Sequence, residues 1–560
     1  MTDQMTRAQA AGGREREALN ETLEDYTLRF APRSYRKWST AVVATSALGG
    51  IAYLADFSIG ANIGMAHGTG NALWGIALFA TVIIATGIPL AVYAARYNLD
   101  LDLITRGSGF GYYGSVVTNL IFASFTFIFF ATEGSIMAQG LQLGLSIPLP
   151  IGYLVSTLIV LPLVIYGMKA LAKLQVWTTP LWLIMMVGPL VYLLVAHPDA
   201  VGDFFAFSGV DADGAPRGEG VSLAGIMLCA GVCLSLIAQI AEQIDYLRFM
   251  PPKTPDNTRR WWTAVLVAGP GWVVFGAIKQ IVGLFLAVYL IGHIADGAGI
   301  ANQPVHQFVV TYEEFMPPWA AMTLAVILVV ISQIKINVTN AYSGSLAWTN
   351  SFTRVTKTYP GRLVFVVVNL GIALVLMESN MFSFLNELLN FYANCGIAWI
   401  VVVATDIVVN KWLLKISPTA PEFRRGMLYA VNPVGFVSVI VAAGTSIAVF
   451  FGAFGDGVAP YSPLVAAALA FVLPPILAIA TGGRYYLRRT DDGIDLPMYD
   501  EHGNPSDVKL LCCVTGVEFE RPDMLASASP APDGSTQYIS SLALACDKTG
   551  KHVLPPQPQR

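Results

Sequence analysis

The chain has 560 residues, of which 55% are hydrophobic and 12% are charged, about half the charged share of an average soluble domain. This composition excludes a purely soluble globular protein and predicts a chain that crosses a lipid bilayer many times. The formal net charge of -4 gives no indication of a nucleic-acid partner, because much of the surface of such a chain faces lipid.

The N-terminal residues 1–38 are polar and contain no short apolar core followed by a small-residue cleavage site. We therefore expect no signal peptide. Since both chain ends are predicted on the same side (below), this segment is expected to be cytoplasmic.

Residues 39–482 hold twelve apolar segments, each long enough to cross the hydrocarbon layer at about 20 residues per span. An all-α membrane domain is therefore predicted. The expected spans are 39–66, 72–95, 113–143, 147–167, 175–196, 221–247, 260–292, 318–350, 362–378, 383–410, 433–455 and 462–482. Those that begin at 113, 260 and 318 are longer than one crossing needs, so we expect them to be tilted or broken.

Lysine and arginine lie in every second connection between these spans. The basic connections hold Arg96 and Arg106; Lys169 and Lys173; Lys253, Arg259 and Arg260; Arg354, Lys357 and Arg362; and Lys411, Lys415, Arg424 and Arg425. The opposite face has only Arg217, in an acidic loop. By the positive-inside rule the basic face is cytoplasmic, and an even number of spans places both termini there, in the cell membrane.

The first and sixth predicted spans are each interrupted. Residues 47–57 read ALGGIAYLADF, with Asp56 near mid-membrane, and residues 237–246 read IAQIAEQIDY, which includes Gln239, Glu242 and Asp245. In transporters built from inverted repeats, broken helices occupy corresponding places in each half, and the substrate lies between them. These spans are five apart, as a five-plus-five inverted repeat requires.

The third and eighth predicted spans are also five apart and carry polar groups. Phe129 and Glu133 are four residues apart and share one helix face, so they offer a planar ligand a stacking ring and an acceptor. Gln333 and Asn337 have the same spacing and add amide donors and acceptors. This set suits a heterocycle with alternating NH and C=O edges, although Phe129 alone is more typical of plain packing.

Ionisable side chains at membrane depth are costly unless they face a partner or a polar cavity, so each one points to function. They are Asp56, Glu133, Glu242, Asp245, Lys279, Lys335 and Glu387. Three of them have a structural alternative. Asp245 can pair with Arg248 at a helix end, Lys279 can snorkel or pair with a carboxylate, and Glu387 can be solvated at the interface.

The tail over residues 483–560 is rich in Asp, Pro, Ser and Gly and is expected to be a small cytoplasmic appendage. Cys512, Cys513 and Cys546 with His502 and His552 could ligate zinc, but adjacent cysteines are not the usual C-x-x-C spacing. We therefore favour an unstructured or weakly folded tail without a metal site.

Several motifs follow one another in a family-specific order. They are APR at 31–33, RKW at 36–38, the loop 106–114, IDYLRF at 244–249 and the asparagine-containing eighth span. In this order they resemble the nucleobase-cation-symport-1 transporters, the permeases for purines, cytosine, uracil, thiamine, allantoin and hydantoins, over residues 20–485. The resemblance implies a LeuT-like core of two inverted five-helix repeats plus two peripheral helices, alternating access and cation-coupled uptake.

The resemblance also implies a substrate site. Carried over by motif from the hydantoin branch, it falls on Phe129, Glu133, Leu236, Glu242 and Asn337, to which the local patterns add Gln239 and Gln333. The chain departs from that branch, because two stacking tryptophans become Phe129 and Leu236 and two neutral groups become carboxylates. These departures allow a more basic or a cationic ligand.

The family's sodium site joins backbone oxygens of the first span to hydroxyl groups of the eighth, where this chain has Ser332. Lys335 lies about one turn away and can supply the charge that sodium otherwise provides. We hypothesise proton coupling, in which Lys335 exchanges charge with Asp56, Glu242 or Asp245. The coupled ion is H+ or Na+, and no resident cofactor or metal is expected.

These observations predict a symporter that imports a nucleobase-like heterocycle or a related polar metabolite, with a small-molecule substrate, a cation and the bilayer as partners. A channel would need a ring of like polar groups. An enzyme would need a convergent catalytic set such as H-E-x-x-H or G-x-S-x-G, and the spans hold neither. The main alternative is a transporter-like sensor that signals through a separate protein.

Overall fold

The computed structural model describes residues 27–165, 167–211, 214–218, 220–294 and 297–557. Most of the predicted N-terminal segment, residues 1–26, lies outside this part, as does the side chain of Lys169. In the described residues, nine helices are long and apolar enough to cross a membrane. This confirms the prediction of a helical membrane protein, while the count of twelve spans stays a prediction.

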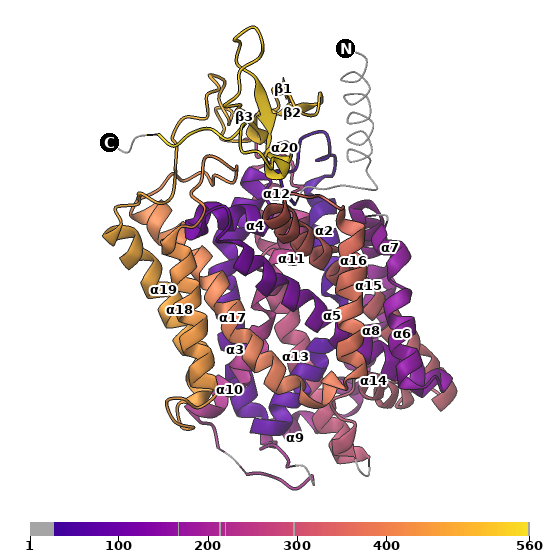
Figure 1. The fold of residues 1–560 in the computed structure, drawn as a ribbon. Helices are drawn as coiled ribbons and strands as arrows, with labels where there is room; N and C mark the ends of the chain where they lie inside the picture. Colours follow the sequence, from indigo (N-terminus) through magenta and orange to yellow (C-terminus); the bar gives the residue numbers. More distant parts are fainter. Residues whose placement is uncertain (1–26, 166, 212–213, 219, 295–296, 558–560) are drawn as a thin grey trace.

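Helices make up the body of the molecule (Figure 1). In chain order they are α2 (Thr40–Gly49), α3 (Ala55–Tyr97), α4 (Leu101–Thr105), α5 (Val116–Leu145), α6 (Leu149–Leu158), α7 (Leu161–Ile165), α8 (Gly167–Ala196), α9 (Ala200–Ala206), α10 (Leu223–Leu234), α11 (Gln239–Leu247), α12 (Thr258–Ala268), α13 (Trp272–His293), α14 (Pro304–Glu313), α15 (Pro318–Thr356), α16 (Arg362–Glu378), α17 (Leu385–Thr405), α18 (Pro433–Phe450), α19 (Ser462–Ala480) and α20 (Ser541–Cys546).

The first predicted span is discontinuous, as expected, whereas the sixth changes only from α to 3-10 geometry and back. In the first, α2 ends in a 3-10 turn, Gly50–Ala52, and the extended backbone of Tyr53 (φ -58°, ψ 151°) separates it from α3. In the sixth, the 3-10 turn Ser235–Ala238 joins α10 to α11 without leaving helical angles. The first interruption is therefore the larger one, and it exposes main-chain groups that a continuous helix would pair.

The long predicted spans behave in two ways. α5 and α15 are continuous over 30 and 39 residues and pack against each other. The span predicted at 260–292 is instead broken at Gly269–Gly271 into α12 and α13. α13 packs closely along α3, because a Cβ on Gly60 would lie 1.8 Å from the carbonyl oxygen of Gln280 and one on Gly283 would lie 2.3 Å from that of Phe57.

The C-terminal region, residues 483–557, is folded, so the expectation of an unstructured or weakly folded tail is wrong. It contains two antiparallel hairpins, β1 (Lys509–Leu511) with β2 (Glu518–Glu520) and β3 (Met524–Ala526) with β4 (Tyr538–Ser540), followed by α20. Its buried apolar side chains form a small core of their own, which includes Phe519, Met524, Leu525 and Ile539. Even a chain of this polar composition can fold when such a core is supported by its neighbours.

Polar contacts attach the C-terminal region to one end of the helix bundle, called here the tail face (Figure 1). The backbone N–H of Arg33 donates to both carboxylate oxygens of Glu520 at 2.9 and 3.0 Å. The side chain of Asn504 accepts from Lys253 N–H at 3.0 Å and donates to its carbonyl oxygen at 3.2 Å. The C-terminal region is therefore attached to the tail face at two places, one before α2 and one after α11.

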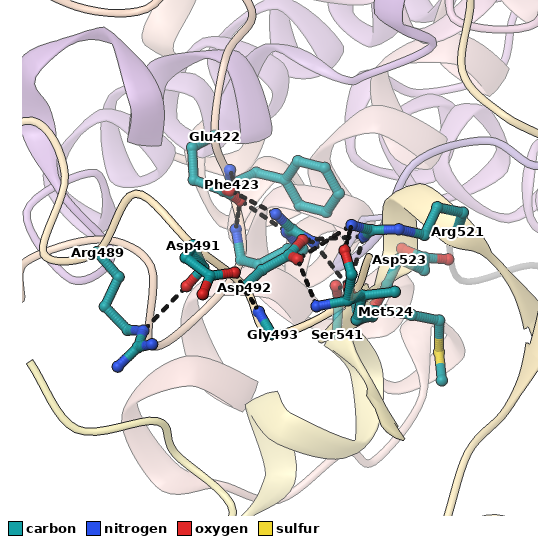
Figure 2. A network of polar contacts seen from close by, with 12 residues as sticks. Glu422, Phe423, Arg489, Asp491, Asp492, Gly493, Arg521, Asp523, Met524 and Ser541 are labelled. Atoms are coloured by element: carbon teal, nitrogen blue, oxygen red, sulfur yellow. Dashed lines mark hydrogen bonds and ion pairs between the residues drawn. The ribbon is translucent and has the colours of Figure 1, made fainter. Parts of the chain in front are cut away.

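A buried arginine network supports the same region (Figure 2). Arg424 contacts Glu422 and Asp492, each at 2.7 Å, and Arg521 contacts Asp492 at 2.9 Å.

In the described residues no group of three or more His, Cys, Asp or Glu side chains lies together in a way that could hold a metal ion. Cys513, Cys546 and His552 line one pocket of the C-terminal region, but they do not form such a group.

Candidate functional site

Asp56 and Lys279 form the charged centre of the bundle. Asp56 lies in the first turn of α3, directly after the interruption, and its Oδ2 is 2.9 Å from the Nζ of Lys279 on α13. Gln280 donates to the other oxygen, Oδ1, at 2.8 Å. Gly276 leaves room for the carboxylate, because a Cβ there would lie 3.3 Å from Oδ2. The pair is almost completely buried: the exposed fraction of the residue is 0% for Asp56 and 3% for Lys279.

Glu133 faces this centre from α5. Its Oε2 accepts a 2.7 Å hydrogen bond from the amide of Gln333 on α15, and the side chain lies in the neighbourhood of Lys279 and Asp56. Asn337, one turn beyond Gln333, donates to the carbonyl oxygen of Phe130 at 3.3 Å. The predicted acceptor and amide groups of the third and eighth spans are therefore brought together.

Glu242 approaches from the sixth span. Its Oε2 accepts a 2.7 Å hydrogen bond from Gln239, three residues earlier, and the side chain lies in the neighbourhood of Glu133. Both glutamates are inside the protein rather than against lipid, with 1% exposure for Glu133 and 0% for Glu242. The site is thus closed to solvent in this structure.

The two expected apolar contact groups are also buried. Leu236 lies in the 3-10 turn between α10 and α11, and Phe129 stacks at 4.6 Å between ring centroids, in a tilted arrangement, on Phe125 of its own helix. The ring of Phe129 is therefore partly engaged in packing. Both positions belong to the elements that carry Glu133 and Glu242.

The side chains of Lys335 and Ser332 both contact α8. The Nζ of Lys335 donates to the carbonyl oxygen of Gln175 at 3.1 Å and to the hydroxyls of Thr178 and Thr179 at 2.8 and 3.0 Å, all on α8. Trp182, also on α8, donates to the Ser332 hydroxyl at 2.9 Å. The direct pairing of Lys335 with Asp56, Glu242 or Asp245 is therefore not the observed arrangement, and Asp56 pairs with Lys279 instead.

Asp245 fits its structural alternative. Its carboxylate accepts from Ser343 at 2.5 Å and lies 4.0 Å from the Arg248 guanidinium. Arg248 also lies 3.7 Å from Asp100. Asp245 therefore belongs to an ionic group near the tail face. Glu387 is exposed, as the interfacial interpretation predicts.

Ion pairs also join helices at the tail face of the bundle. Asp102 in α4 contacts Arg106 at 2.7 Å and Arg354, near the end of α15, at 3.0 Å. Burial disfavours the charge of Asp102, but the two guanidinium groups outweigh this and hold its pKa below the usual range. A cavity of about 20 Å³, lined by Asp245, Phe122 and neighbouring side chains, has room for about one water molecule.

Two contributors to the centre were not singled out from the sequence, Tyr53 and Gln280. The Tyr53 ring lies under the Lys279 ammonium with 3.6 Å between Nζ and the ring centroid, and Gln280 orients Asp56. A lone tyrosine or glutamine in an apolar segment gives no spacing signal. The sequence pointed to this place through Asp56, Lys279 and the interruption beside Tyr53, and not through Tyr53 or Gln280 themselves.

The family model described as permease for cytosine/purines, uracil, thiamine and allantoin matches residues 31–473. Two structures of Mhp1, a nucleobase-cation-symport-1 transporter, are similar at 16% identity: a closed conformation with bromovinylhydantoin bound (TM-score 0.58; 86% of this chain, 98% of that one) and an inward-facing conformation (TM-score 0.59; 81% and 94%).

A substrate-bound, outward-open Na+-coupled sialic acid symporter is also similar, at 13% identity and a TM-score of 0.52, covering 85% of this chain and 96% of that one. No curated protein sequence matches. These structural likenesses concern the fold, and they agree with the inverted-repeat architecture predicted from the two interrupted spans.

Proposed function

Because the chain belongs to the family of permeases for cytosine/purines, uracil, thiamine and allantoin, we propose that it imports a small nitrogenous heterocycle, or a related polar metabolite, together with a cation. Membership of a permease family makes the protein a multi-pass membrane transporter and not an enzyme. Import into the cell, with both termini cytoplasmic, is proposed from the distribution of lysine and arginine.

One observation supports the substrate class most strongly. Among the described residues, three acceptor oxygens of the predicted binding residues are buried without a hydrogen-bond partner: Oε1 of Glu133, of Glu242 and of Gln333. Buried acceptors are nearly always paired, and leaving one unpaired costs about 1–3 kcal/mol. A ligand that carries several N–H groups, or a protonated amine, would provide the donors these oxygens need.

The proposed binding residues come from four helical elements. Glu133 with Phe129, and Gln333 with Asn337, provide a ring and polar groups from α5 and α15. The sixth span adds Gln239, Glu242 and Leu236. Binding between the interrupted spans would tie ligand occupancy to the relative position of the two repeats, which is the basis of alternating access.

For the coupled cation we keep protons as the proposal. Asp56 and Lys335 are the coupling groups, and Lys335 acts through its contacts with α8 rather than through a direct ion pair. Asp245 and Ser332 are engaged in hydrogen bonds to neighbouring helices. We assign them supporting positions in the coupling machinery.

The test begins with thermal-shift screening of nucleobases, ureides, thiamine precursors and cationic amines on the purified full-length protein. A stabilising compound is then used in labelled counterflow exchange in proteoliposomes. Exchange is the expected result. A compound that stabilises the protein but is never exchanged would contradict transport and favour a sensor. Uptake driven by a sodium gradient, and by no proton gradient, would overturn proton coupling.

A further inference from the structure

The ammonium group of Lys279 lies among oxygen atoms that belong to the interrupted first span. Its Nζ donates to the main-chain carbonyl oxygens of Ile51 and Tyr53 at 2.7 and 2.9 Å. It also lies 2.9 Å from the Asp56 carboxylate and 3.6 Å from the centre of the Tyr53 ring. A single cationic group is thus held by two carbonyls, a carboxylate and an aromatic face.

These ligands follow from the local backbone. The carbonyl groups at the end of a helix have no partners within it, and they carry the negative end of the helix dipole. Because Tyr53 is extended, Ile51 and Tyr53 present their oxygens across the interruption instead of along a helix. Carbonyls of unwound segments are the groups that coordinate cations in transporters of this architecture.

A simple ion pair would not require this arrangement. An ion pair with Asp56 needs only one contact of the Lys279 ammonium. Here the ammonium also donates to two main-chain carbonyl oxygens of the interruption between α2 and α3. Gln280 fixes the Asp56 carboxylate through its second oxygen, so the negative charge points toward the ammonium. The close packing of α3 on α13 at Gly60 and Gly283 lets the lysine reach across.

We propose that the interruption between α2 and α3 is a binding site for one monovalent alkali cation, and that Lys279 occupies it as a tethered cation. The ligands of this site are the carbonyl oxygens of Ile51 and Tyr53 and the carboxylate of Asp56. The site differs from the one predicted at Ser332, whose hydroxyl is bonded to Trp182. Removal of the lysine side chain opens the site to Na+ or K+.

This site deepens the proposed cation-coupled transport, because it assigns one fixed positive charge to the first span. Its test does not depend on transport. Thermal unfolding of the full-length Lys279→Ala protein is measured in NaCl and KCl series, with choline chloride keeping the ionic strength constant. We expect the Tm of this variant to rise saturably with Na+ or K+, since a ligand that binds only the folded state stabilises it. The wild-type Tm should not respond.

Two further variants make the result specific. Lys279→Ala combined with Asp56→Asn removes the negative charge and should abolish the response. Lys411→Ala is the matched control, because Lys411 is also buried, on Ser417 and the carbonyl of Pro418, and lies 5.2 Å from the ring of Tyr486. Its Tm should show no ion-specific rise.

The proposal is overturned if Lys279→Ala is insensitive to both cations, or if Lys411→Ala responds equally. It is also overturned if Lys279→Ala fails to fold in every salt while the neutral double variant folds, because a diffusible cation then cannot replace the lysine. Failure of counterflow exchange with a positive cation response would instead overturn only the proposed transport.

Discussion

The amide of Gln333 donates a 2.7 Å hydrogen bond to Glu133, and this contact joins α15 to α5 in the closed interior of the bundle. The two residues are 200 positions apart in the sequence. Each also has an oxygen without a partner. The pair is therefore both a fixed link between two long helices and an acceptor surface for a ligand.

Glu133→Gln tests that surface. The substitution keeps the shape of the side chain but removes its charge, and a hydrogen bond to a charged group contributes about 1.5–3 kcal/mol, or about tenfold or more in affinity. We expect at least that loss of substrate affinity, measured by counterflow and thermal shift, with normal membrane insertion. Glu387→Gln, at an exposed carboxylate, is the control. Unchanged uptake by Glu133→Gln would remove this residue from the site.

Glu242→Gln tests the contribution of the sixth span. Glu242 is bonded to Gln239 on its own helix at 2.7 Å, so the variant should retain the local structure. If the ligand carries a positive charge, loss of this carboxylate shifts selectivity toward neutral heterocycles and weakens cationic ones about tenfold or more. Competition of labelled uptake by neutral and cationic compounds measures this. The same order of inhibitors in both proteins would contradict a direct role.

Lys335→Met tests proton coupling. The variant loses the bonds to α8 at Gln175, Thr178 and Thr179 but keeps most of the volume of the side chain. We expect counterflow exchange to continue while uphill uptake driven by a proton gradient is lost. Thr178→Val, which removes a single one of these bonds, should keep gradient-driven uptake. Uphill accumulation at the wild-type level by Lys335→Met would exclude it from coupling.

Arg424→Ala tests the support of the C-terminal region. Arg424 is buried and holds Glu422, Asp492 and the carbonyl oxygen of Met524, so its removal should cost about 2–3 kcal/mol of local stability. Hydrogen exchange over β3 and β4 would detect the loss. Arg489→Ala removes exposed contacts to Asp491 (Figure 2) and to Pro555, and should change stability by less than about 0.5 kcal/mol. Equal effects would show that burial of Arg424 is unimportant.

Acid should weaken the same network through Asp492. Burial raises the pKa of this carboxyl, but Arg424 and hydrogen bonds from Arg521 and Arg424 lower it more, so the net pKa lies below the usual value. The resulting stability is fully present above the unfolded pKa of about 4 and is lost as the pH falls through the folded value. Hydrogen exchange, corrected for intrinsic rates, should show wild type and Asp492→Asn converging in acid. A constant difference down to about pH 3 would contradict this.

The sequence was informative where a local pattern has one physical meaning. Paired glycines followed by Asp56 predicted the first interruption, and four-residue spacing predicted the shared face of Phe129 and Glu133. It could not show that Asp56 pairs with Lys279, since the two residues are joined only by the packing of α3 on α13. The partners of Lys335 include a main-chain carbonyl, which has no sequence signal at all.

The C-terminal region shows a different limit. Its strands are three residues long, too short for a clear alternating pattern, and its composition is that of a disordered segment. What stabilises it is tertiary: Met427 from the preceding loop joins its core, and Arg424 reaches Asp492. Contacts between distant segments supply what local propensity does not.

The attachment of this region bears on how the molecule can move. It grips the backbone at Arg33, ahead of the first repeat's opening helix, and at Lys253, while α20 rests on α15 of the second repeat. The C-terminal region therefore links the two repeats at this end of the bundle. If the two repeats separate at this end, the C-terminal region has to move with one of them or detach, so a reporter pair at residues 33 and 520 would record opening at the tail face as a change in separation.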